Sequence, residues 1–109
     1  MVSVQKAINE FVKRVNNLND ERITDILLES MEDISAELTV IVDNKDSINP
    51  IIEKTADIVA DIAVEMGIGI EVLVTNIPQE GVQLHARRVY IEIRNPQSSF
   101  RNRYAPLNL

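Results

Sequence analysis

The sequence has 109 residues, of which 45% are hydrophobic, and this length and composition are typical of one globular domain with its own core. It contains no cysteine, which excludes disulfides, thiolate metal sites and a cysteine nucleophile, and favours a cytoplasmic protein. The formal charge of −6 is uneven: residues 1–84 carry 6 Lys and Arg against 16 Asp and Glu (−10), whereas residues 85–109 carry 5 Arg against one Glu (+4). This acidic body argues against a DNA-binding surface over the whole domain.

The first element that the sequence predicts is a helix. Ser3 is a residue type that caps helices, and apolar side chains then recur at helical spacing at Val4, Ile8, Phe11, Val15 and Leu18. The polar run from Asn16 to Asp20 ends this helix. The apolar residues within residues 22–29 fit either a short strand or one face of a second short helix, which periodicity alone does not separate. Residues 29–36 are polar and irregular, so we expect a loop or short helical turn there.

The central part of the chain predicts a strand followed by a helix. Leu38–Val42 is an apolar, mostly β-branched run, which is typical of a buried strand. Asn49 and Pro50 suit a helix start, because Asn caps free amides and Pro gives up no hydrogen bond in the first turn. Apolar positions recur from there at helical spacing, at Ile51, Ile52, Thr55, Val59, Ile62, Ala63 and Met66.

A second strand follows this helix. Gly67 and Gly69 end the helix, and residues 70–74 are again strand-like. A helical connection of this length favours a right-handed crossover, with the two strands parallel or separated by one other strand, so the unit predicts an α/β core. The residues at its centre are expected to be fully buried, namely Ile41, Ile62 and Leu73.

The last part of the sequence alternates between apolar and polar residues with a slip of phase at Arg88. This pattern predicts either a hairpin that turns near that residue or a short helix over residues 82–88 that leads into a last strand. The single histidine, His85, is expected at the surface. We therefore expect one α/β domain over residues 1–95 and an irregular basic tail over residues 96–109.

Five segments in this order form a pattern that covers roughly residues 3–93: Glu10–Val15, Glu21–Ser30, Leu38–Val42, Gly69–Val74 and Glu80–Leu84. The pattern resembles a minimal nucleotidyltransferase, a family that includes antitoxin-type domains. The resemblance implies a small mixed sheet with a strand-helix-strand crossover and an N-terminal helix.

The same resemblance implies where a nucleotide site would lie. Family members carry a Gly-Ser pair that approaches the nucleotide phosphate and an Asp-x-Asp pair that holds magnesium ions. Here these positions read Glu29-Ser30 and Glu37-Leu38-Thr39, and a third family carboxylate falls on Glu71. The remnant candidates are therefore Ser30, Glu37 and Glu71. Because Glu29 puts negative charge where a triphosphate would sit, we expect the protein to bind no cofactor. Magnesium and nucleotide are expected to bind only if a reshaped site remains active.

The basic end of the chain is a second candidate site. Its arginines are interleaved with aromatic residues, and the partner-binding candidates are Arg87, Arg88, Tyr90, Arg101, Arg103 and Tyr104. Such residues stack on bases and pair with phosphates, but they are also enriched in protein interfaces. A terminus that takes no part in binding is a further alternative.

The sequence therefore predicts a non-catalytic or divergent nucleotidyltransferase-like domain that acts by binding. It binds either a protein partner, for which a toxin-type protein is one candidate, or another copy of itself in a homo-oligomer. Two alternatives stay open: an active nucleotidyltransferase with a reshaped magnesium–nucleotide site, and a small viral or mobile-element protein that binds nucleic acid through its basic tail. No apolar run is long enough to span a membrane, so we expect no membrane contact and a cytoplasmic location.

Overall fold

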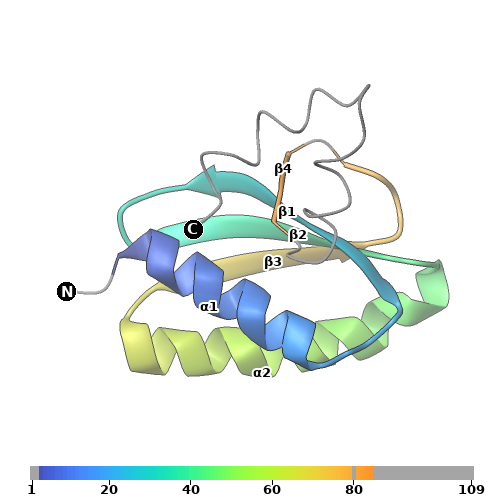
Figure 1. Ribbon diagram of the computed structural model, residues 1–109, viewed down its shortest axis with the longest axis horizontal. Coiled ribbons are helices and arrows are strands. Elements are labelled where there is room, and N and C mark those ends of the chain that lie inside the picture. The colour runs from blue at the N-terminus through green and yellow to red at the C-terminus, as the bar shows by residue number, and fades with distance from the viewer. Residues whose placement is uncertain (1–2, 80, 85–109) are drawn as a thin grey trace.

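Figure 1 shows the computed structural model of the protein, which describes residues 3–79 and 81–84. The described chain forms helices and strands in the order α1 (Val4–Asn17), β1 (Ile23–Met31), β2 (Ser35–Val42), a short 3-10 helix (Lys45–Ser47), α2 (Ile48–Met66), β3 (Gly69–Thr75) and β4 (Val82–Gln83).

The strands form one mixed sheet in the order β3-β2-β1-β4. β1 pairs antiparallel with both β2 and β4, whereas β2 and β3 are parallel. Because α2 connects these two parallel neighbours, the predicted strand-helix-strand crossover is confirmed, as is the α/β class with a small mixed sheet and an N-terminal helix.

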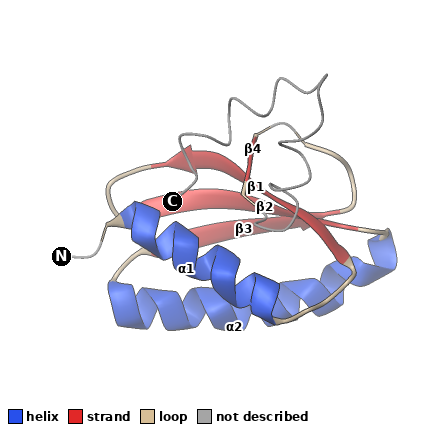
Figure 2. Ribbon diagram, in the orientation of Figure 1, coloured by secondary structure: helices blue, strands red, loops and turns tan. Residues whose placement is uncertain are grey.

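Both helices cover the same face of the sheet, and the core lies between them and the strands (Figure 2). The largest fully buried side chains come from every layer, including Phe11 of α1, Ile26 of β1, Leu38 of β2 and Ile62 of α2. No helix among the described residues covers the opposite face, which we call the open face. Its side chains are Asp25, Leu27, Glu29 and Ser30 of β1, Glu37, Thr39 and Ile41 of β2, Glu71, Leu73 and Thr75 of β3, and Gln83 of β4.

The helix ends follow local capping chemistry. The Ser3 hydroxyl accepts a hydrogen bond from the Lys6 amide at 3.2 Å, as its residue type predicts. α2 begins at Ile48 rather than after a cap at Asn49, because a 3-10 turn capped by Asn44 leads directly into it. Gly67 ends α2 in the left-handed conformation (φ 71°), which glycine adopts without a steric penalty.

The expectation of a loop or helical turn over residues 29–36 is wrong. β1 continues to Met31 and β2 begins at Ser35, with the Glu32 amide donating to the Ser35 carbonyl oxygen at 2.8 Å across the tight turn. These strand ends extend past the core, so their side chains are exposed and the sequence lacks apolar alternation there. The same finding settles residues 22–29 as strand.

The burial expected at the centre of the crossover is confirmed for Ile41 and Ile62, which are 9% and 0% exposed, but is wrong for Leu73, which is 55% exposed. Both Ile41 and Leu73 face the open side of the sheet, but Ile41 lies on the inner strand β2, whereas Leu73 lies on the edge strand β3. The neighbours Val72 and Val74 face the helices. A run of apolar residues does not reveal which of them faces the core.

Residues 82–88 belong only in part to the described chain. Val82 and Gln83 form the short strand β4 beside β1, and the Leu84 amide donates to the Ile26 carbonyl oxygen at 2.6 Å. The predicted turn or helix near Arg88, the following strand and the tail over residues 96–109 lie outside the described residues. Within the part that is described, no helix combines the length and the apolar character needed to cross a membrane.

Candidate functional site

Two glutamates of the open face lie side by side on neighbouring parallel strands. Glu37 of β2 is in register with Glu71 of β3, and Thr39 is in register with Leu73 one step further along. Both glutamates are exposed, because side chains in a strand alternate between faces and this phase points away from the helices. The register thus aligns two carboxylate-bearing residues across adjacent strands.

A β-bulge in β1 adds two more polar side chains to this row. The register between β1 and β2 shifts between Leu28 and Ser30, so that both Glu29 and Ser30 lie on the open face near Glu37. The Ser30 hydroxyl donates to Glu37 Oε1 at 2.8 Å. The Thr39 hydroxyl donates to Glu29 Oε2, also at 2.8 Å. These bonds fix both carboxylates on the sheet surface.

The connection from β3 to β4 forms the rim of the site. β3 and β4 are at opposite edges of the sheet, and both helices cover the other face, so this connection passes the open face and brings Gln79 beside the glutamates. Gly81 allows the close approach to β1 that follows, because a Cβ atom there would lie 3.0 Å from the Leu28 carbonyl oxygen. The rim is therefore tied to the same strand that carries the bulge.

These elements enclose a pocket of about 380 Å³ on the open face, lined by Glu29, Glu37, Leu38, Thr39, Glu71, Val72, Leu73 and Gln79. A smaller depression of about 180 Å³ adjoins it, lined by Ser30, Glu32, Ser35, Ala36, Glu37 and Glu71. Glu37 and Glu71 belong to both. Among the residues that the structure describes, those lining the pocket and the depression include four glutamates and no Lys, Arg or His.

This arrangement favours positively charged groups. Carboxylates on adjacent strands accept hydrogen bonds from a guanidinium or ammonium group, and a guanidinium does so with two parallel bonds. A triphosphate would meet like charges at Glu29, Glu37 and Glu71. Among the residues that the structure describes, no three His, Cys, Asp or Glu side chains lie close enough together to hold one metal ion.

The residues proposed from the sequence fall into two groups. The structure brings Ser30, Glu37 and Glu71 together, with the Glu29 carboxylate on the same face. The other candidates lie outside the described residues. They are His85, which is expected at the surface, and the partner-binding candidates Arg87, Arg88, Tyr90, Arg101, Arg103 and Tyr104. Sequence reasoning missed Gln79 and Leu73 as lining residues, because only strand register and the path of a loop bring them to the pocket.

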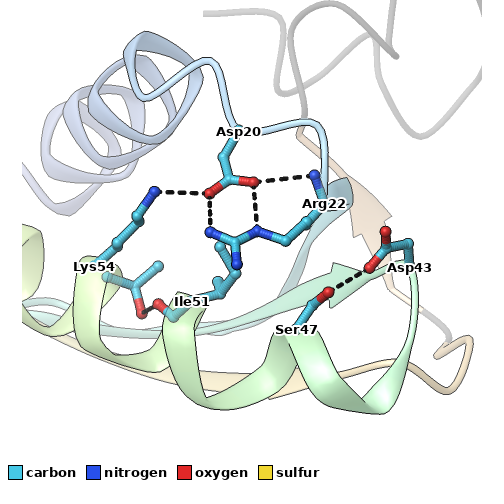
Figure 3. Close-up of polar contacts among 7 residues, drawn as sticks. Asp20, Arg22, Asp43, Ser47, Ile51 and Lys54 are labelled. Atoms are coloured by element: carbon cyan, nitrogen blue, oxygen red, sulfur yellow. Dashed lines mark hydrogen bonds and ion pairs between the residues drawn. The ribbon is translucent and has the colours of Figure 1, made fainter.

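A second polar cluster, also missed from the sequence, lies on the helix-covered side (Figure 3). The Asp20 carboxylate is only 7% exposed and binds the Arg22 guanidinium at 2.6 and 2.9 Å and the Lys54 ammonium at 2.8 Å. The hydrogen bonds from Arg22, and then those from Lys54, hold the pKa of Asp20 well below its usual range. Because its charges are compensated, this cluster joins the α1–β1 connection to α2 rather than offering a binding site.

Comparison of the chain with known protein families, with curated proteins and with solved structures found no match. The function therefore has to be argued from the chemistry of the open face.

Proposed function

We propose that this chain is a binding domain whose open face takes a positively charged protein segment, and that it does not transfer nucleotidyl groups. The observation that carries the proposal is the alignment of Glu37 with Glu71, beside Glu29 in the bulge, in a pocket whose lining contains no cation within the described part of the chain. Uncompensated carboxylates on an exposed surface attract a cationic partner and steer its approach.

An arginine side chain fits the chemistry of the pocket. Its guanidinium can form paired hydrogen bonds with Glu37 and Glu71, while its methylene groups cover the exposed Leu73. The volume of about 380 Å³ is in the range of small ligand sites and suits one or two long side chains rather than a whole folded domain.

The chain itself contains a segment of this chemistry. Residues 85–109 carry 5 Arg and a single Glu, with the partner-binding candidates among them. A homo-oligomer in which residues 82–104 of one copy contact the acidic body of another is one form of the proposal. A separate basic protein, of toxin type if the antitoxin resemblance reflects ancestry, is the other form.

Nucleotidyltransferase-like ancestry belongs to the same proposal. It is supported by the order of the elements and by the position of Ser30, Glu37 and Glu71 on one face of a mixed sheet. The residues that differ from the family pattern, above all Glu29, oppose the binding of a triphosphate and so favour a role in binding without catalysis.

Binding of a labelled peptide with the sequence of residues 85–109 to the full chain tests the proposal. We expect binding that weakens with salt and that falls at least about tenfold in the double variant Glu37→Gln/Glu71→Gln, because each loses charge-assisted hydrogen bonds. The matched control is Asp57→Asn/Asp61→Asn, which removes the same charge from exposed residues of α2. Equal loss of affinity in both variants would show a non-specific effect of net charge and would contradict the proposal.

A further inference from the structure

We propose that a second copy of this chain docks along the outer edge of β3 and the adjoining side of α2, so that two sheets join into one continuous sheet. The surface involved is defined by the edge of Gly69–Thr75 and by an apolar flank of α2. It adjoins the pocket, which Glu71, Val72 and Leu73 of β3 also line, but the inference does not rest on the proposed function.

The first observation is the direction of the backbone groups of β3. The Gly69 amide donates to the Ile34 carbonyl oxygen at 2.9 Å, toward β2. Successive residues of a strand turn their N–H and C=O groups to opposite edges, so those of Ile70, Val72 and Val74 point outward. β3 is the last strand on this side, and no strand within residues 3–79 and 81–84 pairs with that edge. An edge of this kind is a ready template for another strand.

The second observation is that this edge is complementary to itself. The three outward-facing residues are centred on Val72, the middle residue of β3. A two-fold axis at Val72 therefore pairs Val72 with its own copy and Ile70 with Val74 of the other copy, in an antiparallel ladder. In that register Glu71 lies opposite Leu73 of the other copy. No like charges are directly opposed, and the exposed Leu73 gains a neighbour.

The third observation is the character of the α2 flank beside this edge. α1 lies along the opposite flank, where Arg14 binds Glu65 at 2.7 Å and Lys54 reaches Asp20 at 2.8 Å. The flank turned away from α1 carries the apolar side chains of Ile52, Ala56, Val59 and Ala63. Ile52 is 44% exposed although it is aliphatic. Figure 1 shows α2 running beneath β3, so the edge and the flank form one surface.

The small size of these side chains suits a pair of helices. A two-fold axis at the middle of β3 brings the middle of α2, near Ala56 and Val59, beside the same part of the other copy. Alanine at positions 56 and 63 allows two antiparallel helices to approach closely without a gap to fill, and no charge has to be desolvated. The ladder of strands and the helix contact therefore impose the same symmetry.

Salt dependence separates this contact from one made by the basic segment. Each copy carries a formal charge of −6, so two copies repel each other and salt relieves that repulsion. The β3–α2 dimer should hold or strengthen as salt rises. A contact between an arginine-rich segment and the acidic open face should weaken under the same change.

The test is sedimentation of the full chain over a concentration series at low and at high salt, with Ala56→Lys as the disrupting variant. Because a lysine in the centre of an apolar contact must be desolvated, we expect its dimer dissociation constant to rise at least about tenfold. Val64→Lys is the matched control, since Val64 is 87% exposed on the side of α2 that points away from the sheet. It adds the same charge and should leave the dimer unchanged. Glu37→Gln, which changes only the inner strand β2, should also leave it intact, even if peptide binding is weakened.

Hydrogen exchange of the wild-type chain identifies the strand edge directly. The amides of Ile70, Val72 and Val74 should be protected at high concentration and exchange faster on dilution, whereas the inward-facing amides of Glu71 and Leu73 should stay protected throughout. A monomer at every concentration and salt overturns the proposal, as does a dimer that Ala56→Lys does not weaken. Concentration-independent protection of the outward amides also overturns it, because the edge is then covered within one chain.

Discussion

Carboxylates on the two faces of the sheet differ in burial and in whether a cationic side chain is bound to them. On the helix-covered side, Asp20 is nearly buried and has Arg22 and Lys54 bound to it. On the open face, Glu37 and Glu71 stand in register and exposed, and the described residues that line their pocket include no cation. The charge of Asp20 is thus compensated within the fold, whereas those of Glu37 and Glu71 have no counterion among the described lining residues.

The largest contrast between the two faces should come from the apolar residues. Ile62 is completely buried under the sheet, so Ile62→Ala should lower the free energy of unfolding by about 2–5 kcal/mol. Leu73 is 55% exposed on the open face, so Leu73→Ala should lower it by less than about 1 kcal/mol. Urea denaturation of both variants measures the difference. An unchanged midpoint for Ile62→Ala would show that the crossover is not packed as described.

The second contrast concerns the compensated carboxylate. Asp20→Ala should lower the free energy of unfolding by about 1–3 kcal/mol at neutral pH, because Arg22 and Lys54 lose their common acceptor. Protonation of Asp20 at low pH should also lower the free energy of unfolding. Its pKa is depressed in the folded state, so its contribution is complete above the unfolded pKa of about 4 and is lost as pH falls below that value.

Denaturation of the wild-type chain and of Asp20→Asn at a series of pH values measures this contribution. The wild-type chain should be the more stable of the two at neutral pH, and the gap should narrow as the solution is acidified. A constant gap from neutral to strongly acidic pH would contradict the assignment of the depressed pKa to Asp20.

Removing the charges of Glu37 and Glu71 should not destabilise the protein, in contrast to removing the charge of Asp20. Because Glu37 and Glu71 are like charges on adjacent strands, Glu37→Gln/Glu71→Gln should leave stability unchanged or raise it by about 0.5 kcal/mol. The gain should shrink as salt rises and screens the repulsion. Thermal denaturation at low and high salt is the measurement, with Asp57→Asn/Asp61→Asn as the control. A marked loss of stability would assign these glutamates a structural role instead.

The smallest expected effect is the heat of binding of magnesium and nucleotide. Calorimetric titration of the chain with magnesium and each nucleoside triphosphate should show no tight binding, because three glutamates of the pocket oppose the phosphates. Micromolar binding that Glu37→Ala abolishes would favour the alternative of an active nucleotidyltransferase with a reshaped site.

The sequence by itself determined the elements whose signals are local. Helical spacing and a Ser3 cap predict α1, Gly67 marks the end of α2, and β-branched runs mark β2 and β3. Ser30, Glu37 and Glu71 are named as candidates through the resemblance of the sequence to a minimal nucleotidyltransferase, and the parallel register of β2 and β3 places Glu37 beside Glu71. These features depend on residues close together in the chain or on connection length.

Only the tertiary structure decided which faces and which distant residues meet. Strand register turned Leu73 outward although the apolar run around it is continuous, and a bulge at Glu29 and Ser30 put both side chains on one face. The connection after β3 brought Gln79 to the pocket, and chain reversal placed Lys54 against Asp20. Packing over the whole domain determines which strands and which helices pair, so local periodicity in the sequence does not predict this pairing.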